Sequence, residues 1–246
     1  MDFHIEESTG AVRCNEKLSA DIKAHAWSQY PKESVGAVVS GKYVPLHNSH
    51  PDPHTSFIAM DCPDDAEALI HSHPDTQSCP SAADMTQQAI MSIPWGIVSV
   101  SGRSSQVSEV EWFGEGCPIS PLLGRTFLSG VRDCWCLVKD WYTLEHPEIG
   151  HKLPQLPRDH DWYKDEIDLL GRQNIADAGF EQIHVSEMRE GDVILGRIGA
   201  RVVNHCGGYW GGNRALSHME GRLSRLEVVH HWLKRAECIL RHKDLR

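Results

Sequence analysis

The chain has 246 residues, of which 40% are hydrophobic and 24% charged, and its formal net charge is -10. This length suits two compact domains of ordinary size, and the composition is that of a globular protein rather than of a disordered chain. The negative charge argues against nucleic acid as a partner, because proteins that bind nucleic acid concentrate Lys and Arg against its phosphates.

The amino terminus predicts no export signal, since residues 1–7 lack a basic region followed by an apolar run. No later segment reaches membrane-spanning length, so we expect no membrane insertion. The eight cysteines are scattered along the chain, which favours reduced thiols in a cytoplasm over a disulfide framework.

In the first half of the chain, helix and strand signals alternate. Apolar side chains recur at helical spacing in two segments, and short apolar runs rich in β-branched residues lie between them. In the second of these helices, Met85, Ala89 and Ile90 form the predicted inner face. The predicted elements are a helix over residues 16–30, strands over 35–39 and 70–74, a helix that begins at 81 and ends before Pro94, and a strand over 97–100.

A turn-rich stretch between Gly114 and Gly124 is the best candidate for a linker. We place the boundary within it, which gives domains over residues 1–113 and 114–246. The predicted fold class is mixed α+β, with an α/β first domain and a second domain in which a helix precedes antiparallel strands.

In the second domain, residues 134–144 have helical spacing, whereas residues from Asp192 onward alternate as strands do. Glycine pairs at 207–208 and 211–212 are expected to break these strands, as in a sheet made of hairpins. Residues 147–161 are rich in Pro and Asp and are expected to form a long surface loop.

Two histidines and a carboxylate predict a zinc site in the first domain. His71 and His73 are separated by one residue on a predicted strand, so both imidazoles project to the same side. Asp84, in the first turn of the next helix, adds an oxygen ligand, and three protein ligands leave a fourth position open, as in catalytic zinc sites. Glu33, at a helix-to-strand junction, is the candidate base, and Ser81 could hydrogen-bond the oxyanion that forms during amide hydrolysis.

Each of these residues also has an ordinary explanation, since Ser81 and Asp84 form an S-x-x-D helix cap and both histidines could lie beside a loop. Taken together, the upstream Glu and H-S-H-P-x6-S-x2-D resemble the JAMM metallopeptidase signature, over roughly the first half of the chain. The resemblance implies a JAMM/MPN-type α/β domain that binds Zn2+. In that family the matching residues would be the zinc ligands His71, His73 and Asp84, the base Glu33 and the oxyanion-stabilising Ser81.

A cysteine and two histidines form a second candidate site. Cys134 begins a predicted helix, where the helix dipole and free amide groups favour thiolate over thiol. His205 ends a predicted strand, and the returning strand carries His218, which could lie behind His205 and fix its ring while His205 takes the thiol proton. A buried cysteine is often only a packing residue, and Cys134 with Cys136 could be half of a metal site, although no second close cysteine pair supports one.

The D-C-x-x-L-V helix start, the segment Gly191–Leu195 and the strand from His205 to Trp210 resemble the NlpC/P60 family over most of the second half. The resemblance implies a papain-like core that cleaves amide bonds in bacterial cell-wall peptides. Its triad would be Cys134, His205 and His218.

Two positions depart from that family's pattern. Phe127 stands where the family often has an active-site tyrosine, and Cys136 replaces the small residue after the nucleophile. Ser217 is the second candidate for the third triad position. Cys206, beside His205, is expected to be a packing residue, and Trp210 could line the groove or belong to the core.

The succession of the two modules resembles a family of tail assembly proteins of lambda-like siphophages, over nearly the whole chain. The resemblance implies a tail-tip hydrolase that acts on host peptidoglycan, with other tail-tip or baseplate-hub proteins as partners. It would be present in the host cytoplasm during assembly and then at the virion tail tip, acting in the periplasm on infection. Two alternatives stay open: a structural tail-tip subunit whose peptidase folds serve assembly contacts, or a JAMM module that matures a tail protein.

Overall fold

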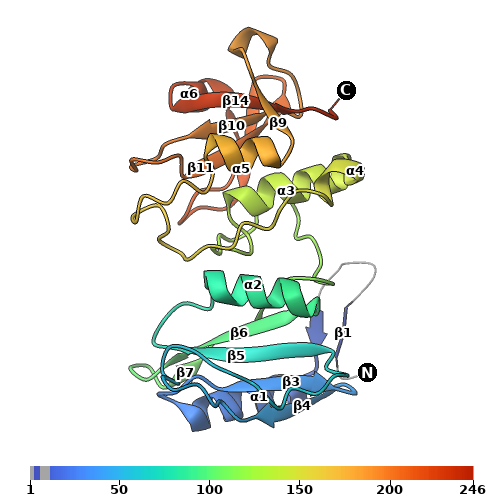
Figure 1. The fold of residues 1–246 in the computed structure, drawn as a ribbon, viewed down its shortest axis with the longest axis vertical. Helices are drawn as coiled ribbons and strands as arrows, with labels where there is room; N and C mark the ends of the chain where they lie inside the picture. Colours follow the sequence, from blue (N-terminus) through green and yellow to red (C-terminus); the bar gives the residue numbers. More distant parts are fainter. Residues whose placement is uncertain (1–2, 6–11, 246) are drawn as a thin grey trace. The chain divides into compact units, whose positions relative to one another are not determined.

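The computed structural model describes residues 3–5 and 12–245, and the chain divides into two compact units, residues 1–119 and 120–246 (Figure 1). The division lies at 119/120 rather than at 113/114, because the turn that follows the last strand of the first sheet stays with the first unit. Most of residues 1–7, which predicted no export signal, lie outside the described residues.

The first unit is built on a sheet with strand order β4-β3-β5-β6-β7, in which β8 also pairs with β6. β5 and β6 are parallel, and the remaining pairs of this sheet are antiparallel. A separate short pair joins β1 to β2. The strands are β1 (Phe3–Ile5), β2 (Val12–Cys14), β3 (Val35–Val39), β4 (Lys42–Leu46), β5 (Ala68–Pro74), β6 (Trp95–Ser101), β7 (Gln106–Val107) and β8 (Glu111–Phe113).

Two helices cover opposite faces of this sheet, α1 (Glu16–Gln29) on one and α2 (Ala82–Met91) on the other (Figure 1). Successive side chains of a strand alternate between the two faces. Accordingly, Ala68 and Ile70 of β5 pack with α1 in one core cluster, while His71 and His73 face the α2 side. The helices and strands predicted for this half are confirmed.

The predicted inner face of α2 is confirmed at Met85 and wrong at Ala89 and Ile90. Ala89 is exposed and Ile90 is 71% exposed, whereas the buried residues of the helix are Asp84, Met85 and Gln88. The helix is rotated so that its first turn brings the Asp84 carboxylate to the histidines of β5. The contact of Asp84 with these histidines therefore sets the orientation of α2, which differs from the one that the spacing of apolar residues predicted.

The second unit contains an antiparallel sheet with strand order β13-β12-β11-β10-β14-β9. α3 packs on one face and α6 on the other, because Val193 and Leu195 of β10 belong to the α3 cluster while Ile194 belongs to the α6 cluster. The elements are α3 (Cys134–Glu145), α4 (Pro147–Gly150), α5 (Arg172–Asp177), β9 (Phe180–Ile183), the 3-10 turn η1 (Val185–Glu187), β10 (Val193–Gly196), β11 (His205–Gly211), β12 (Arg214–Ser217), β13 (Arg225–Val228), α6 (Val229–Leu233) and β14 (Ala236–His242).

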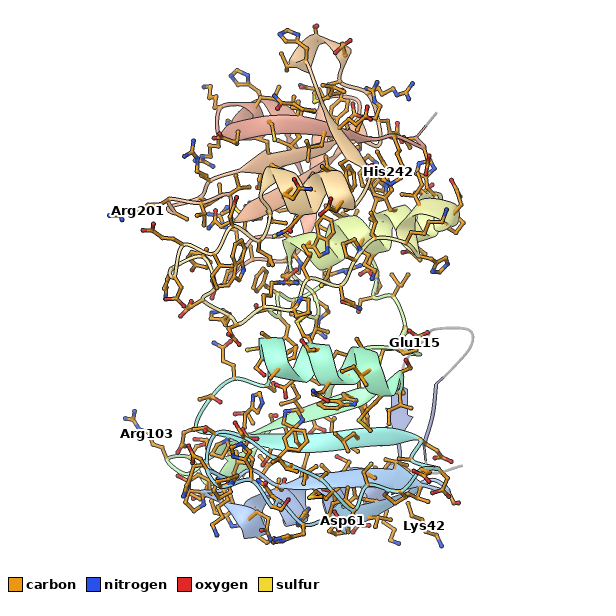
Figure 2. All side chains as sticks on the ribbon, in the orientation of Figure 1. Lys42, Asp61, Arg103, Glu115, Arg201 and His242 are labelled. Carbon is orange, nitrogen blue, oxygen red and sulfur yellow. The ribbon has the colours of Figure 1, made fainter. Side chains whose placement is uncertain are left out.

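The central strand β11 begins at His205, where the sequence predicted a strand to end. The preceding residues are not strand, and Arg201 points outward from this unit with its side chain 86% exposed (Figure 2). Gly207 and Gly208 lie inside β11 rather than breaking it. Position 208 requires a glycine because a Cβ there would collide with the ring of Trp141 in α3. Glycine here permits close approach of helix and strand. The turn that follows is made by Gly212 and Asn213, and Gly211 is the last residue of β11.

Residues 147–161 are not a surface loop. They begin with the short helix α4, and Ile149, Leu153 and Leu156 are buried in the same core cluster as α3. Arg158 is also buried, at 4% exposure. Proline and aspartate gave this segment the composition of a loop, but its leucines anchor it to the core. Among the described residues, none of the helices combines the length and apolar character that a membrane crossing requires.

Candidate functional site

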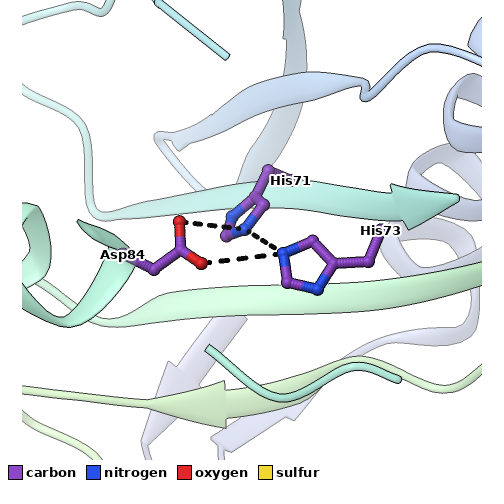
Figure 3. A group of neighbouring side chains, drawn as sticks. All are labelled: His71, His73 and Asp84. Atoms are coloured by element: carbon purple, nitrogen blue, oxygen red, sulfur yellow. Dashed lines mark hydrogen bonds and ion pairs between the residues drawn. The ribbon is translucent and has the colours of Figure 1, made fainter. Parts of the chain in front are cut away.

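His71, His73 and Asp84 converge in the first unit, as the sequence predicted (Figure 3). The two Nε2 atoms lie 3.0 Å apart, and the Asp84 carboxylate oxygens lie 3.4 Å from that of His71 and 3.6 Å from that of His73. His73 Nδ1 lies 3.0 Å from the Gln77 carbonyl, a contact that favours the tautomer with Nε2 free as a ligand. His71 Nδ1 is buried, and none of the described residues hydrogen-bonds it.

These separations fit a metal ion. Ligand atoms placed about 2.0–2.1 Å from zinc at tetrahedral angles are about 3.3 Å from one another. The three measured separations, 3.0, 3.4 and 3.6 Å, lie around that value. Two imidazole nitrogens and one carboxylate are also the donor set that catalytic zinc accepts.

The start of β3 positions Glu33 beside this cluster. Val35 pairs with His71 across the two strands, and Ser34 and Ser72 bond each other: Ser34 N donates to Ser72 Oγ at 2.8 Å and Ser72 N donates to the Ser34 carbonyl at 3.0 Å. Ser72, which lies between the two histidines of β5, thus holds the residue that follows the candidate base Glu33. Sequence spacing alone did not indicate that role for Ser72.

Glu33 is buried at 6% exposure and lines a cavity of about 760 Å³ together with His73, Ser81 and Asp84. Burial raises its pKa to about 7; the charge of His73 opposes this rise, and Asp84 adds to it. A carboxyl group that titrates near neutrality can both accept and return a proton, as a general base must.

Ser81 is bound to Asp84 as a helix cap. Its hydroxyl donates to Asp84 Oδ2 at 2.7 Å and accepts from Asp84 N at 3.1 Å, while Ser81 N donates to the same carboxylate oxygen at 2.8 Å. Ser81 and Asp84 therefore form the helix cap, and the same Asp84 carboxylate also lies beside the two histidines. The oxyanion role of Ser81 stays a prediction, since it would require the hydroxyl to turn away from Asp84.

In the second unit, Cys134 is the first residue of α3 and lines a cavity of about 160 Å³ with His205. The thiol of Cys206 donates to it and, together with His205, holds the pKa of Cys134 well below its ordinary value despite burial. Burial and the neighbouring Cys134 raise the pKa of Cys206. Cys206 is thus more than the packing residue that the sequence predicted, because it contacts the candidate nucleophile.

His218 is fully buried, but among the described residues no hydrogen bond of ordinary geometry reaches either of its ring nitrogens. Its ring packs edge-on against Phe127, with centroids 5.3 Å apart. Burial and the charge of Arg125 lower the pKa of His218, while the charges of Asp133 and Cys134 oppose this lowering. The structure does not join it to His205 by a hydrogen bond.

The face of His205 is instead covered by Trp232 of α6, whose ring stacks on it at 4.8 Å. Trp232 Nε1 donates to Glu227 Oε2 at 3.0 Å, and Ser217 Oγ donates to the same oxygen at 3.0 Å. Ser217 is thereby linked to His205 through Glu227 and Trp232. Neither Trp232 nor Glu227 was predicted from the sequence, because nothing local in the chain marks either one.

The two departures from the NlpC/P60 pattern have structural explanations. Phe127 lines the cavity and packs on His218, while Cys136 lies in the first turn of α3, where burial raises its pKa to about 12. Trp210 stacks on Trp141 at 5.5 Å and packs against the core.

Comparison with known proteins gives matches to both halves of the chain. A family model described as the NlpC/P60 family matches residues 122–241. Tail tip assembly protein K of Escherichia phage N15 is 31% identical, over 94% of this chain and 96% of that protein. Tail tip assembly protein K of Escherichia phage lambda is 32% identical, over 73% of this chain and 83% of that protein. A solved NlpC/P60 family protein from Bacillus cereus aligns at 13% identity over 94% of this chain and 67% of its own, with a TM-score of 0.34 that is too low to define the fold.

Proposed function

Because this chain belongs to the family of the phage tail tip assembly proteins K, we propose that it is a tail-tip component that hydrolyses amide bonds in host peptidoglycan. The reacting residues would be Cys134 and His205 of its NlpC/P60 domain. Other tail-tip or baseplate-hub proteins would be its partners, first in the host cytoplasm during assembly and then in the virion.

One observation carries this proposal: Cys134 begins a helix, beside His205, in a cavity on the surface of the second unit. His205 accepts the thiol proton, and the thiolate attacks the amide carbonyl. The free amides of the first turn of α3 can stabilise the oxyanion, and His205 returns the proton to the leaving amine. Water then hydrolyses the thioester. His218, the third residue expected from the sequence, stays a prediction.

The lining of the cavity suits a short charged peptide. His160 and Glu220 lie 3.3 Å apart on its wall, and Asn204 and Ser129 add further polar groups. Stem peptides of peptidoglycan carry amino and carboxyl groups, which such side chains can bind. These polar groups lie among apolar and aromatic side chains such as Trp162 and Leu170, so the cavity could bind both the charged ends and the aliphatic parts of a cell-wall peptide.

The test is hydrolysis of purified Gram-negative peptidoglycan by the wild type, Cys134→Ala and Glu33→Gln, with products identified by mass spectrometry. We expect soluble fragments from the wild type and from Glu33→Gln, and none from Cys134→Ala. The mass of the products names the bond that is cut. If a folded wild type releases nothing, the assembly role without catalysis replaces this proposal.

We propose a second, zinc-dependent peptidase site at His71, His73 and Asp84, motivated by the tetrahedral separations of their ligand atoms. Zinc bound there would lower the pKa of a water molecule and polarise a substrate carbonyl. Glu33 would accept a proton in the cavity and pass it to the leaving amine. This module would have the JAMM/MPN type.

The zinc content of the purified protein tests this second proposal, and a Glu33→Gln variant is its matched control. Glu33 is no ligand in this arrangement, so Glu33→Gln keeps zinc but loses the activity of this site. Unprocessed tail protein in phage carrying Glu33→Gln would identify a maturation role. Normal plaques from a Cys134→Ala, His71→Ala double mutant would favour the structural alternative for both sites.

A further inference from the structure

The segment that the sequence assigned to a surface loop brings a buried cation beneath the Cys134 site. Arg158 Nε donates to Asp133 Oδ2 at 3.0 Å, and its Nη2 pairs with the same carboxylate oxygen. Nη1 donates to the Leu156 carbonyl, and Nη2 also lies 3.4 Å from Cys136 Sγ. Both ionic side chains are almost fully buried, at 4% and 6% exposure.

Asp133 is the residue immediately before Cys134 and caps α3. Its Oδ1 accepts from Cys136 N at 3.1 Å, and its Oδ2 accepts from Gly130 N at 2.8 Å. A buried carboxylate at this position stabilises the helix start but repels a thiolate one residue away. That repulsion raises the pKa of Cys134, against the lowering by Cys206 and His205. The cap and the nucleophile therefore conflict electrostatically unless the carboxylate charge is compensated.

We propose that Arg158 is a positioning residue of the Cys134 site, which neutralises the Asp133 cap so that Cys134 can hold a negative charge, and which fixes the segment that walls the cleft. The proposal rests on the proposed cysteine peptidase function. Arg158 acts through Asp133 and does not itself contact substrate.

The second part of this role follows from the residues around Arg158. Trp135, the second residue of α3, donates its Nε1 to the Pro154 carbonyl at 3.0 Å, and Leu156 is buried in the core cluster. The segment that these contacts fix continues into His160, which lines the same cavity as Cys134. One ion pair thus couples the helix that carries the nucleophile to the wall of its cleft.

The charge on Cys134 responds to groups on several elements, and a test must separate them. His205 and Cys206 act from β11, His218 from the end of β12, and Asp133 and Arg158 from beneath the helix. Substituting Asp133 and Arg158 singly and together isolates this pair, because the other three groups are unchanged in every variant.

The experiment measures the rate of Cys134 alkylation by iodoacetamide between pH 4 and 9, read by mass spectrometry of the peptide that contains Cys134. In Arg158→Met, we expect the rate at pH 6 to fall about tenfold, which is one pKa unit of the thiol. Asp133→Asn, which keeps a capping side chain, should be at least as fast as the wild type. The Asp133→Asn, Arg158→Met double variant should return to within about threefold of the wild type, since neither charge remains.

A double variant as slow as Arg158→Met would overturn the proposal, and so would an Arg158→Lys variant that keeps the charge but reacts as slowly as Arg158→Met. If Arg158→Met does not fold, the double variant and Arg158→Lys still decide, because neither leaves Asp133 as a lone buried charge. Arg201→Met is the control, since Arg201 pairs with Glu166 at the surface. Alkylation needs no substrate, so this result is independent of whether the protein hydrolyses peptidoglycan.

Discussion

A single methyl group on Gly208 tests whether close packing of α3 on β11 sets the Cys134 site. In Gly208→Ala, the added Cβ would lie about 1 Å inside the 3.4 Å at which ordinary contact with the Trp141 ring begins. The clash must push the helix that starts at Cys134 away from the strand that starts at His205. Overpacking of this kind costs about 1–3 kcal/mol, and a displacement of about 1 Å at a reacting pair can lower a rate about 100-fold.

The assay combines thermal unfolding with the rate of Cys134 alkylation at pH 6. We expect the melting temperature of the second unit to fall by roughly 4–10 °C and the alkylation rate to fall about tenfold, as the thiol loses its contact with His205. Replacing Trp141 by Leu in the Gly208→Ala background removes the clashing ring and should restore the alkylation rate, although the smaller side chain leaves the core less stable.

Gly199→Ala is the matched control for this experiment. A Cβ there has nothing within 4 Å, but the residue has a φ of +60°, so the variant loses stability through backbone strain alone. Its alkylation rate should equal that of the wild type. A normal alkylation rate of Cys134 in a folded Gly208→Ala would refute the reasoning, because the spacing of α3 and β11 would then not control the reactivity of Cys134.

Three further predictions concern the ligand set, the buried ion pair and the third catalytic position. His71→Ala should lower the zinc content from about one ion per chain to near zero by mass spectrometry, since two protein ligands hold zinc poorly. Burial alone would raise the pKa of Asp133, but Arg158 lowers it overall, so the ion pair stabilises the fold above pH 3.8 and its contribution is lost as the pH falls below that value. Acid unfolding should therefore depend less steeply on pH in Arg158→Met, which at pH 7 should also be less stable by about 3–5 kcal/mol in urea titration. Ser217→Ala and His218→Ala should each keep the hydrolysis rate within about tenfold of the wild type, because neither side chain hydrogen-bonds His205. A residue that orients a catalytic histidine contributes about 10⁴-fold to the rate. A thousandfold loss in either variant would therefore identify it as the third catalytic residue.

The convergence of His71, His73 and Asp84 was predictable because it depends on local patterns in the sequence. Residues two apart on a strand share a face, which brings His71 and His73 together, and an S-x-x-D cap fixes where the Asp84 carboxylate lies. The helix start at Cys134 was also predicted, and in the structure the preceding aspartate caps it. Each of these features lies within a few residues of chain, so a sequence pattern contains all of it.

The predictions that were wrong depend on contacts between residues far apart in the chain. The Pro-rich and Asp-rich composition of residues 147–161 predicted a surface loop, yet Arg158 is buried because it meets Asp133, 25 residues earlier in the chain. The rotation of α2 follows from a carboxylate that reaches another strand, and Gly208 was misread as a strand break because the ring that requires a glycine there lies on α3.

The sequence by itself determined which residues stand at the ends of strands and helices, and hence the positions of the candidate nucleophile Cys134, the two converging histidines and the cap carboxylate Asp84. Tertiary structure alone decided what surrounds them: Cys206 beside Cys134, Trp232 over His205 and Arg158 beneath the helix. The reason is that propensity and periodicity act over a few residues, whereas burial of a charge or a ring is favourable only when packing brings a distant partner to it.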